Sequence, residues 1–178
     1  MIGLADRMLA VHDGLEAAGL PHAIGGAIAL GYCVLEARAT QDIDVNVFVR
    51  PERARDVFAA LPAGIAPTGS DLEHAEHEGQ VRLHWGHTPI DLFMSVLPFH
   101  DDTQRNVRRV AFGDRTIPVL SCTALAVFKA MFSRPRDWVD IEAMVEARSL
   151  DLDEAKLWLI EMMGEGDERV TTLEAYRR

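Results

Sequence analysis

The sequence has few cysteines, no long apolar run and no excess of basic residues, and each absence excludes a class of protein. Its 178 residues include two cysteines, Cys33 and Cys122, which form neither a CxxC pair nor a dense disulfide framework. We therefore expect both to be buried apolar side chains, and a reducing compartment fits. The longest uncharged run, residues 23–35, contains three glycines and is too short to span a bilayer. We expect a soluble, cytoplasmic protein that makes no contact with a membrane.

The charge balance of the chain is unfavourable for binding nucleic acids in general. A formal net charge of -10 opposes general nucleic-acid binding, because phosphate backbones are held by clustered lysine and arginine side chains. A local basic site is still compatible with this total. The acidic background would equally attract a cationic small molecule.

Hydrophobic periodicity predicts an α/β (α+β) protein with a small mixed β-sheet flanked by helices, followed by a helical bundle segment. Residues 42–49, DIDVNVFV, alternate strictly and predict a half-buried strand, while residues 81–93 predict a hairpin. Residues 62–79 are polar and predict a loop. The pattern becomes helical from Ser121, and we divide the chain into an α/β core over 1–118 and a helical region over 119–178.

Two carboxylates stand close together in the predicted strand. Asp42 and Asp44 are two residues apart, so both side chains project to the same side. Two like charges about 4 Å apart repel by roughly 4 kcal/mol at an effective dielectric constant near 20, so a cation is expected beside them. Asp91, in the predicted hairpin, adds a third carboxylate, and this all-oxygen set suits Mg²⁺. The alternative is a solvated strand end, in which the carboxylates pair with Arg38.

A pair of glycines precedes these carboxylates. Gly25 and Gly26 follow a short predicted strand and precede a predicted helix from about Ala27 to Leu35. Backbone N–H groups and the positive end of that helix can hold phosphate, and the missing side chains permit close approach. Together with the carboxylates, this suggests a nucleoside triphosphate (NTP) bound with Mg²⁺. The spacing G-x-x-x-x-G-K-[ST] is absent, so the chain is not a P-loop protein.

The order of these features resembles the nucleotidyltransferase superfamily related to DNA polymerase beta, over roughly residues 20–145. The R-x-T-x-D-I-D form is most similar to the AbiEii-type toxin branch and more distantly to small antibiotic nucleotidyltransferases. A lysine followed by an R-x-x-D-x-x-D helix also resembles the AbiEii branch. The chain departs from the pattern at Gly26, where many relatives carry serine. The resemblance is carried by Gly25, Gly26, Arg38, Thr40, Asp42, Asp44, Asp91, Lys129 and Asp137.

The resemblance implies a nucleotidyltransferase fold and a two-metal enzyme that moves a nucleoside monophosphate from an NTP to a hydroxyl acceptor. Asp42 and Asp44 would bind both Mg²⁺ ions, and Asp91 would bind the ion beside the attacking hydroxyl. Lys129, in the helical region that completes the active site, would place a positive charge on the triphosphate, and Asp137 would orient Lys129 or the substrate. The implied NTP-binding residues are Gly25, Gly26, Arg38, Thr40 and Lys129.

Simpler interpretations of the last two residues remain open. Lys129 could be a solvated helix side chain, and Asp137 a first-turn carboxylate favoured by the helix dipole. Histidines also allow a zinc site to be drawn, but a polar loop and an exposed turn are where ordinary histidines usually lie. The histidines concerned are His74, His77, His84 and His87.

The acceptor and the class of function stay open as well. The acceptor is tRNA, a protein or a cationic antibiotic of the aminoglycoside type, and a toxin of the AbiEii branch would have a cognate antitoxin as partner. A degenerate, non-catalytic binding module with the same fold is the alternative to an enzyme. The three carboxylates favour the enzyme, because without a metal they would burden a module with unneutralised charge.

Overall fold

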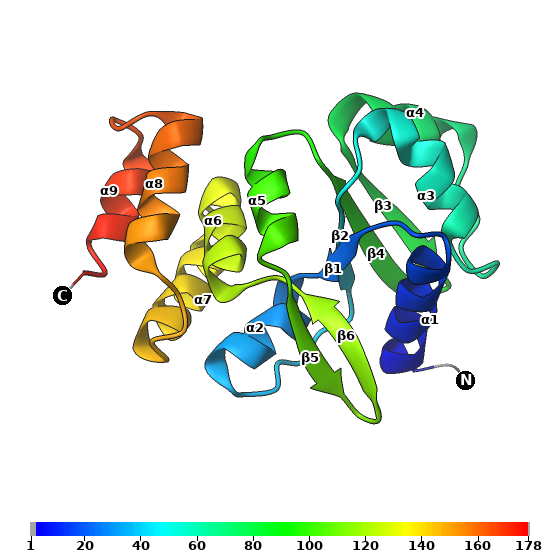
Figure 1. The fold of residues 1–178 in the computed structure, drawn as a ribbon, viewed down its shortest axis with the longest axis horizontal. Helices are drawn as coiled ribbons and strands as arrows, with labels where there is room; N and C mark the ends of the chain where they lie inside the picture. The colour runs from blue at the N-terminus through cyan, green and yellow to red at the C-terminus, as the bar shows by residue number, and fades with distance from the viewer. Residues whose placement is uncertain (1–2, 178) are drawn as a thin grey trace. The chain divides into compact units, whose positions relative to one another are not determined.

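The computed structural model describes residues 3–177, and within them one six-stranded mixed sheet is the main feature (Figure 1). Its strands are β1 His22–Ile24, β2 Ile43–Val47, β3 Gln80–Trp85, β4 Thr88–Met94, β5 Arg108–Phe112 and β6 Arg115–Val119. Their order across the sheet is β3-β4-β2-β1-β6-β5. Strand β2 runs parallel to β4 and β1 runs parallel to β6, while the other neighbours are antiparallel.

The chain forms two compact units. The first comprises Met1–Gly26 and Ala39–Val119, and the second comprises Ala27–Arg38 and Leu120–Arg178. The first unit holds the whole sheet together with helices α1 Leu4–Ala17, η1 Pro51–Arg53, α3 Ala54–Ala60, α4 Gly69–Glu78 and α5 Phe99–Arg105. The second holds α2 Gly26–Val34, α6 Cys122–Phe132, α7 Pro135–Glu146, α8 Leu152–Met163 and α9 Glu168–Glu174. The division into domains over 1–118 and 119–178 remains a prediction. It did not anticipate that residues 27–38 group with the C-terminal helices.

The core of the first unit is built on the alternating side chains of its central strands. Ile43 of β2 is the register partner of Ile90 of β4, and both are fully buried. The half-buried strand predicted for residues 42–49 is wrong in its second half. Asn46 and Phe48, expected on the open face, are only 5% and 7% exposed. Asp44, at the start of β2, keeps intermediate exposure, so the polar end of the strand alone meets solvent.

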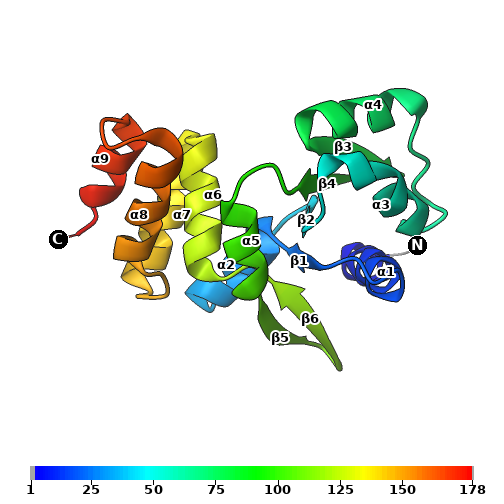
Figure 2. The same ribbon diagram turned by 45° about the horizontal axis from the view of Figure 1, so that its top comes forward.

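The predicted polar loop over 62–79 is also wrong in part, because α4 occupies Gly69–Glu78. The Thr68 hydroxyl accepts a hydrogen bond from the Asp71 backbone N–H, and the Asp71 carboxylate accepts one from the Thr68 N–H. This reciprocal capping box satisfies N–H groups that the first helical turn leaves unpaired. Gly79, with φ at 69°, ends the helix in the left-handed conformation. Helix α4 packs against β3 (Figure 2).

A disulfide bond joins Cys33 of α2 to Cys122 at the start of α6, within the second unit. Both cysteines are buried, as expected, but they are paired, so the prediction of ordinary buried thiols is wrong. The sequence offered no pairing because 89 residues separate the two positions. The argument for a reducing compartment therefore loses its basis.

The helices of the second unit present apolar faces to one another, and α6 packs against α7, α8 and α9. Its fully buried side chains include Ala126 and Val127 on α6, Ile141 on α7 and Leu159 on α8. Among residues 3–177, no helix is both long and apolar enough to cross a membrane.

Removal of the disulfide is expected to destabilise the protein. A cross-link restricts the unfolded chain, and closure of a loop this long corresponds to about 2–5 kcal/mol. The double variant Cys33→Ala, Cys122→Ala should therefore lose about that much free energy of unfolding in urea titration. A reductant should bring the wild-type protein close to the variant and leave the variant unchanged; a wild-type stability that ignores reductant would contradict the cross-link.

Candidate functional site

A row of charged side chains crosses three neighbouring strands of the sheet. Asp44 on β2 is the register partner of Asp91 on β4, and Asp91 is the register partner of Arg82 on β3. Register partners on adjacent strands project to the same face. On the other side of β2, the Gly25 N–H donates a hydrogen bond of 2.8 Å to the Asp44 carbonyl. The fold therefore aligns the glycine pair with the second and third predicted carboxylates.

Asp42, just before β2, joins this row. Its backbone N–H donates to the Thr40 hydroxyl, which donates to the Asp42 carbonyl, each over 3.2 Å. One nitrogen of Arg82 lies 4.0 Å from the Asp42 carboxylate and 2.7 Å from that of Asp91. Thr40, predicted to contact NTP, thus shapes the turn that carries Asp42.

Arg82 is the functional residue that the sequence interpretation missed. Its Nε and terminal nitrogen donate to the two oxygens of Asp91, each at 2.7 Å. The hydrogen bond and charge of Asp91, then the charges of Asp42 and Asp44, raise the pKa of Arg82 above its usual value. The cation required beside the carboxylates is thus supplied by β3. The carboxylates are therefore partly neutralised without a metal ion, contrary to the expectation from the sequence.

The missing side chain of Gly26 has a structural reason. Its φ is 52°, a left-handed conformation that glycine adopts without strain, and a Cβ built there would overlap the Asp44 carboxylate. Serine at position 26, as in many relatives of the resembled family, would require Asp44 to move. The position of the Asp44 carboxylate therefore requires the glycine at position 26.

The chemistry of this donor set fits Mg²⁺. Three carboxylates and one guanidinium leave a formal charge of -2 on oxygen ligands, which is the ligand type that Mg²⁺ prefers. Within residues 3–177, however, the oxygens of Asp42, Asp44 and Asp91 do not converge on a single ion-binding point. Arg82 takes both oxygens of Asp91, so shared binding of an ion requires Arg82 to release part of that contact.

Lys129 and Asp137 lie together in the second unit, with two further charged residues. The Lys129 ammonium is 2.6 Å from Asp140 and 3.4 Å from Asp137, and its side chain is 12% exposed. Arg134 donates to Asp137 through its backbone N–H at 3.1 Å and its Nε at 2.7 Å. Lys129 is therefore not a solvated side chain, because its ammonium is ion-paired with both carboxylates.

Asp137 is fully buried, and its protonation is set by these partners. Burial alone would raise the pKa of this carboxyl, but the hydrogen bond from Arg134 and the charge of Lys129 outweigh it and hold the pKa below its usual value. The capping contact to the Arg134 N–H also begins α7. The cluster is thus an anchored part of the helical unit.

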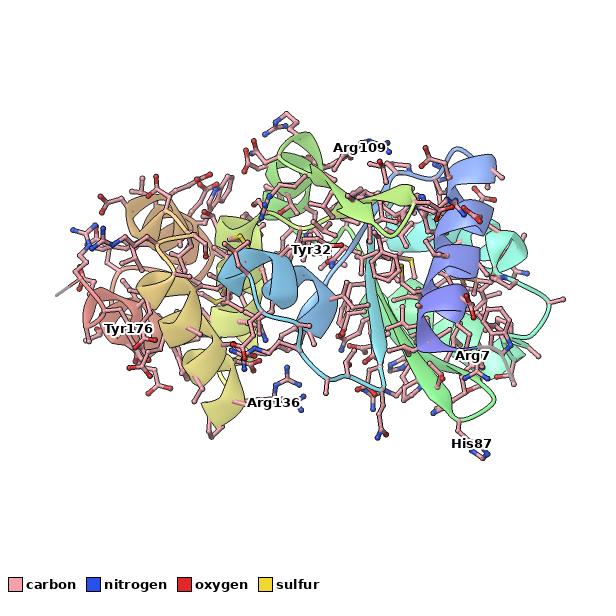
Figure 3. The ribbon with its side chains drawn as sticks, turned by 90° about the horizontal axis from the view of Figure 1, so that it is seen from below. Arg7, Tyr32, His87, Arg109, Arg136 and Tyr176 are labelled. Carbon is pink, nitrogen blue, oxygen red and sulfur yellow. A yellow bond between two sulfur atoms is a disulfide. The ribbon has the colours of Figure 1, made fainter. Side chains whose placement is uncertain are left out.

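The remaining predicted residues are exposed. Arg38 is exposed on the segment that follows α2. The four histidines considered for zinc are all exposed, on α4 and on the β3–β4 hairpin. His87 lies at the hairpin tip and points away from the sheet (Figure 3). Among the described residues they form no group with the spacing of metal ligands.

Comparison with known proteins supplies the fold. No protein-family model matches the chain, and no curated protein matches its sequence. Solved structures do match. A crystal structure of ANT(2'')-Ia in complex with adenylyl-2''-tobramycin covers 97% of this chain and 96% of its own, with a TM-score of 0.61 and 12% identity. The lincomycin-bound lincosamide antibiotic adenylyltransferase LnuA covers 78% and 94%, with a TM-score of 0.53 and 14% identity.

The chain has the nucleotidyltransferase fold. A solution structure of ANT(2'')-Ia agrees, with 96% of this chain and 89% of its own covered at a TM-score of 0.57 and 16% identity. The predicted fold class is confirmed. The AbiEii-type branch stays a prediction, since these structures are antibiotic-modifying enzymes and their identities are low.

Replacement of Arg82 tests its place among the carboxylates. In Arg82→Gln the carboxylates lose their cation, so the free energy of unfolding without divalent ions should fall by about 1 kcal/mol. Mg²⁺ should then stabilise the variant more than the wild type, because it meets one competing positive charge fewer. Urea titrations with and without Mg²⁺ measure both effects. Arg53→Gln removes an exposed pair with Asp56 and should leave the Mg²⁺ effect unchanged.

Asp137→Asn tests the buried cluster in the second unit. Loss of one partner in a buried pair costs about 3–5 kcal/mol, so the variant should unfold at a much lower urea concentration. The folded-state pKa is lowered, so the stabilisation is complete above the ordinary carboxyl pKa of 3.8 and is lost as pH falls through the folded-state pKa. Wild-type stability should therefore drop in acid more steeply than that of the variant. Asp114→Asn, in an exposed turn, is the control.

Proposed function

We propose that this chain, with Mg²⁺, transfers a nucleoside monophosphate from an NTP to a hydroxyl group of an acceptor: the hydroxyl oxygen loses its proton and bonds to the α-phosphate, and pyrophosphate leaves. The observation that carries the proposal is the register pairing of Asp44 with Asp91 on a nucleotidyltransferase fold. Asp42 lies two residues before Asp44 in the sequence. Two carboxylates directly opposite each other destabilise a sheet unless a cation offsets their repulsion, and the single charge of Arg82 offsets only part of it. A divalent ion bound with a substrate would offset the rest.

The chain's residues divide the work between nucleotide and acceptor. Asp42 and Asp44 would hold the Mg²⁺ ions, and Asp91 would help to hold the ion on the acceptor side and would accept the proton of the acceptor hydroxyl. When bound, Mg²⁺ lowers the pKa of that hydroxyl and neutralises charge at the α-phosphate. Arg82 holds the Asp91 carboxylate in a fixed orientation through two hydrogen bonds.

The triphosphate is proposed to lie over the glycine pair. Gly26 begins α2, where backbone N–H groups can bind phosphate, and the space of its missing Cβ is occupied by the Asp44 carboxylate. Thr40 is a further proposed nucleotide contact in the same unit. Arg38 and Lys129 belong to the second unit and keep the nucleotide-binding role predicted for them; the Lys129 ammonium would bind a phosphate oxygen in exchange for Asp140.

The acceptor we favour is a small cationic molecule of the antibiotic type. A net charge of -10 attracts such a molecule and repels RNA. One structure of the same fold, ANT(2'')-Ia, is in complex with adenylyl-2''-tobramycin, so this class of acceptor is the first to test. The second candidate is AbiEii-like transfer to tRNA or protein, controlled by an antitoxin; the Lys129–Asp140 segment favours it.

The first measurement is thermal unfolding with Mg²⁺ and each NTP. Because each completes the binding site of the other, the two together should raise the melting temperature beyond either alone. Asp44→Asn should lose this combined effect, and Asp56→Asn, an exposed carboxylate of the same unit, should retain it. Absence of a shift with any NTP would favour the non-catalytic module.

The second measurement identifies the acceptor. The protein is incubated with labelled NTP, Mg²⁺ and separate pools of aminoglycosides, tRNA and cell protein, and the labelled product is isolated. Asp91→Asn is expected to bind Mg²⁺-NTP with similar affinity and to lose nearly all transfer, because Asp91 acts on the acceptor. Transfer at near the wild-type rate by this variant would remove Asp91 from the site.

A further inference from the structure

A second group of potential metal ligands lies in the first unit, on residues to which nothing above gives a role. His12 and Glu16 are one helical turn apart on α1, and His22 is the first residue of β1. One ligand atom from each residue lies within 4.8 Å of the others. His22 is the register partner of Val47 at the far end of β2 from Asp44, so this group is separate from the carboxylate row.

The two imidazoles face each other inside the protein. His12 Nδ1 lies 2.8 Å from His22 Nε2, and the two side chains are only 4% and 5% exposed. His22 Nδ1 lies 2.8 Å from the Leu20 carbonyl oxygen, which can only accept a hydrogen bond. His22 Nδ1 therefore carries its proton, and His22 Nε2 presents a lone pair toward His12.

That backbone contact is the support that metal-binding histidines usually have. A ligating imidazole almost always donates its other N–H to a carbonyl or carboxylate, which fixes the tautomer and the ring orientation. The chain reaches this position through the end of α1. The Leu20 N–H donates to the Leu15 carbonyl, and Gly19, with φ at 65°, turns the chain back beside the helix.

A neutral imidazole ring has one nitrogen that carries a proton and one that presents a lone pair. Neutral imidazole is the form that binds metals. In His12, transfer of the ring proton from Nδ1 to Nε2 is enough to direct a second lone pair at the point that His22 faces.

Glu16 provides the charge and the solvent-facing side of the group. Its side chain is 55% exposed and lies 3.7 Å from Arg109 of β5, itself 60% exposed. Exposed pairs of this kind contribute little, so a divalent ion can take the Glu16 carboxylate from Arg109. Two imidazoles and one carboxylate leave a fourth tetrahedral position open to water.

We propose that His12, Glu16 and His22 form a binding site for one borderline transition-metal ion of the Zn²⁺ class. Nitrogen ligands distinguish this site from the oxygen-only carboxylate row, which suits Mg²⁺. By linking the end of α1 to β1, the ion would hold the helix against the sheet. The proposed metal site does not depend on nucleotidyl transfer.

The test is a titration of the full chain without a histidine tag, with excess Mg²⁺ present to occupy oxygen-only sites. Co²⁺, followed by visible absorption, should bind at one ion per chain with the intensity of a tetrahedral site, and Zn²⁺ should displace it. Glu16→Gln and His12→Gln should each weaken binding about tenfold or more. His87→Gln, at the exposed hairpin tip, is the matched control and should not.

Arg109→Gln should change the affinity for the ion in the opposite direction. With its competing cation removed, Glu16 should bind the ion more tightly than in the wild type. Glu16 is exposed, so Glu16→Gln is expected to fold even if a histidine variant does not. Absence of Co²⁺ binding, or binding that Glu16→Gln leaves unchanged, would overturn the proposal and leave the histidines as a hydrogen-bonded pair.

Discussion

The repulsion between Asp44 and Asp91 is the constraint on which the local structure of the first unit depends. Side by side on parallel strands, they would drive β2 and β4 apart if nothing else held these strands together. The opposite face of both strands is a continuous apolar layer, in which Val45 and Leu92 are fully buried register partners. Burial of that layer keeps the strands paired, and the repulsion is left to be relieved by a cation.

Arg82 relieves part of the repulsion, and its position could have been obtained from the sequence. A two-residue turn, Gly86-His87, places Trp85 opposite Thr88, and counting back along the hairpin brings Arg82 opposite Asp91. The partnership of Asp44 with Asp91 is different. Their strands are parallel and no turn joins them, so their register is set by packing of the apolar layer and cannot be counted from a turn.

The other differences between prediction and structure have local or tertiary causes. Helix α4 was readable from Thr68, Asp71 and Gly79, a capping box and a left-handed stop, but its polar composition suggested a loop. Only Ala75 of this helix is fully buried, so the apolar stripe that usually marks a helix is weak. The burial of Phe48 depends on elements distant in the sequence, and no local pattern contains it.

Local and tertiary causes also explain which parts of the candidate site the sequence could indicate. The carboxylates and glycines were predictable because each is unusual in its own strand or turn. The His12–His22 pair was not, because two histidines ten residues apart become neighbours only through the turn at Gly19. The partners of Lys129 follow helix geometry more closely, since Asp137 and Asp140 lie three apart on α7.

The grouping of residues 27–38 with the C-terminal helices has a consequence for how this protein can be divided. The chain passes between its two units after Gly26, after Arg38 and after Val119, so the first unit is not a continuous stretch of sequence. A fragment that ends at Val119 would keep α2 but lose Cys122, its covalent partner. Neither unit can thus be exchanged between proteins as a simple cassette, and a stand-alone version of either would need the chain to be reconnected in a new order.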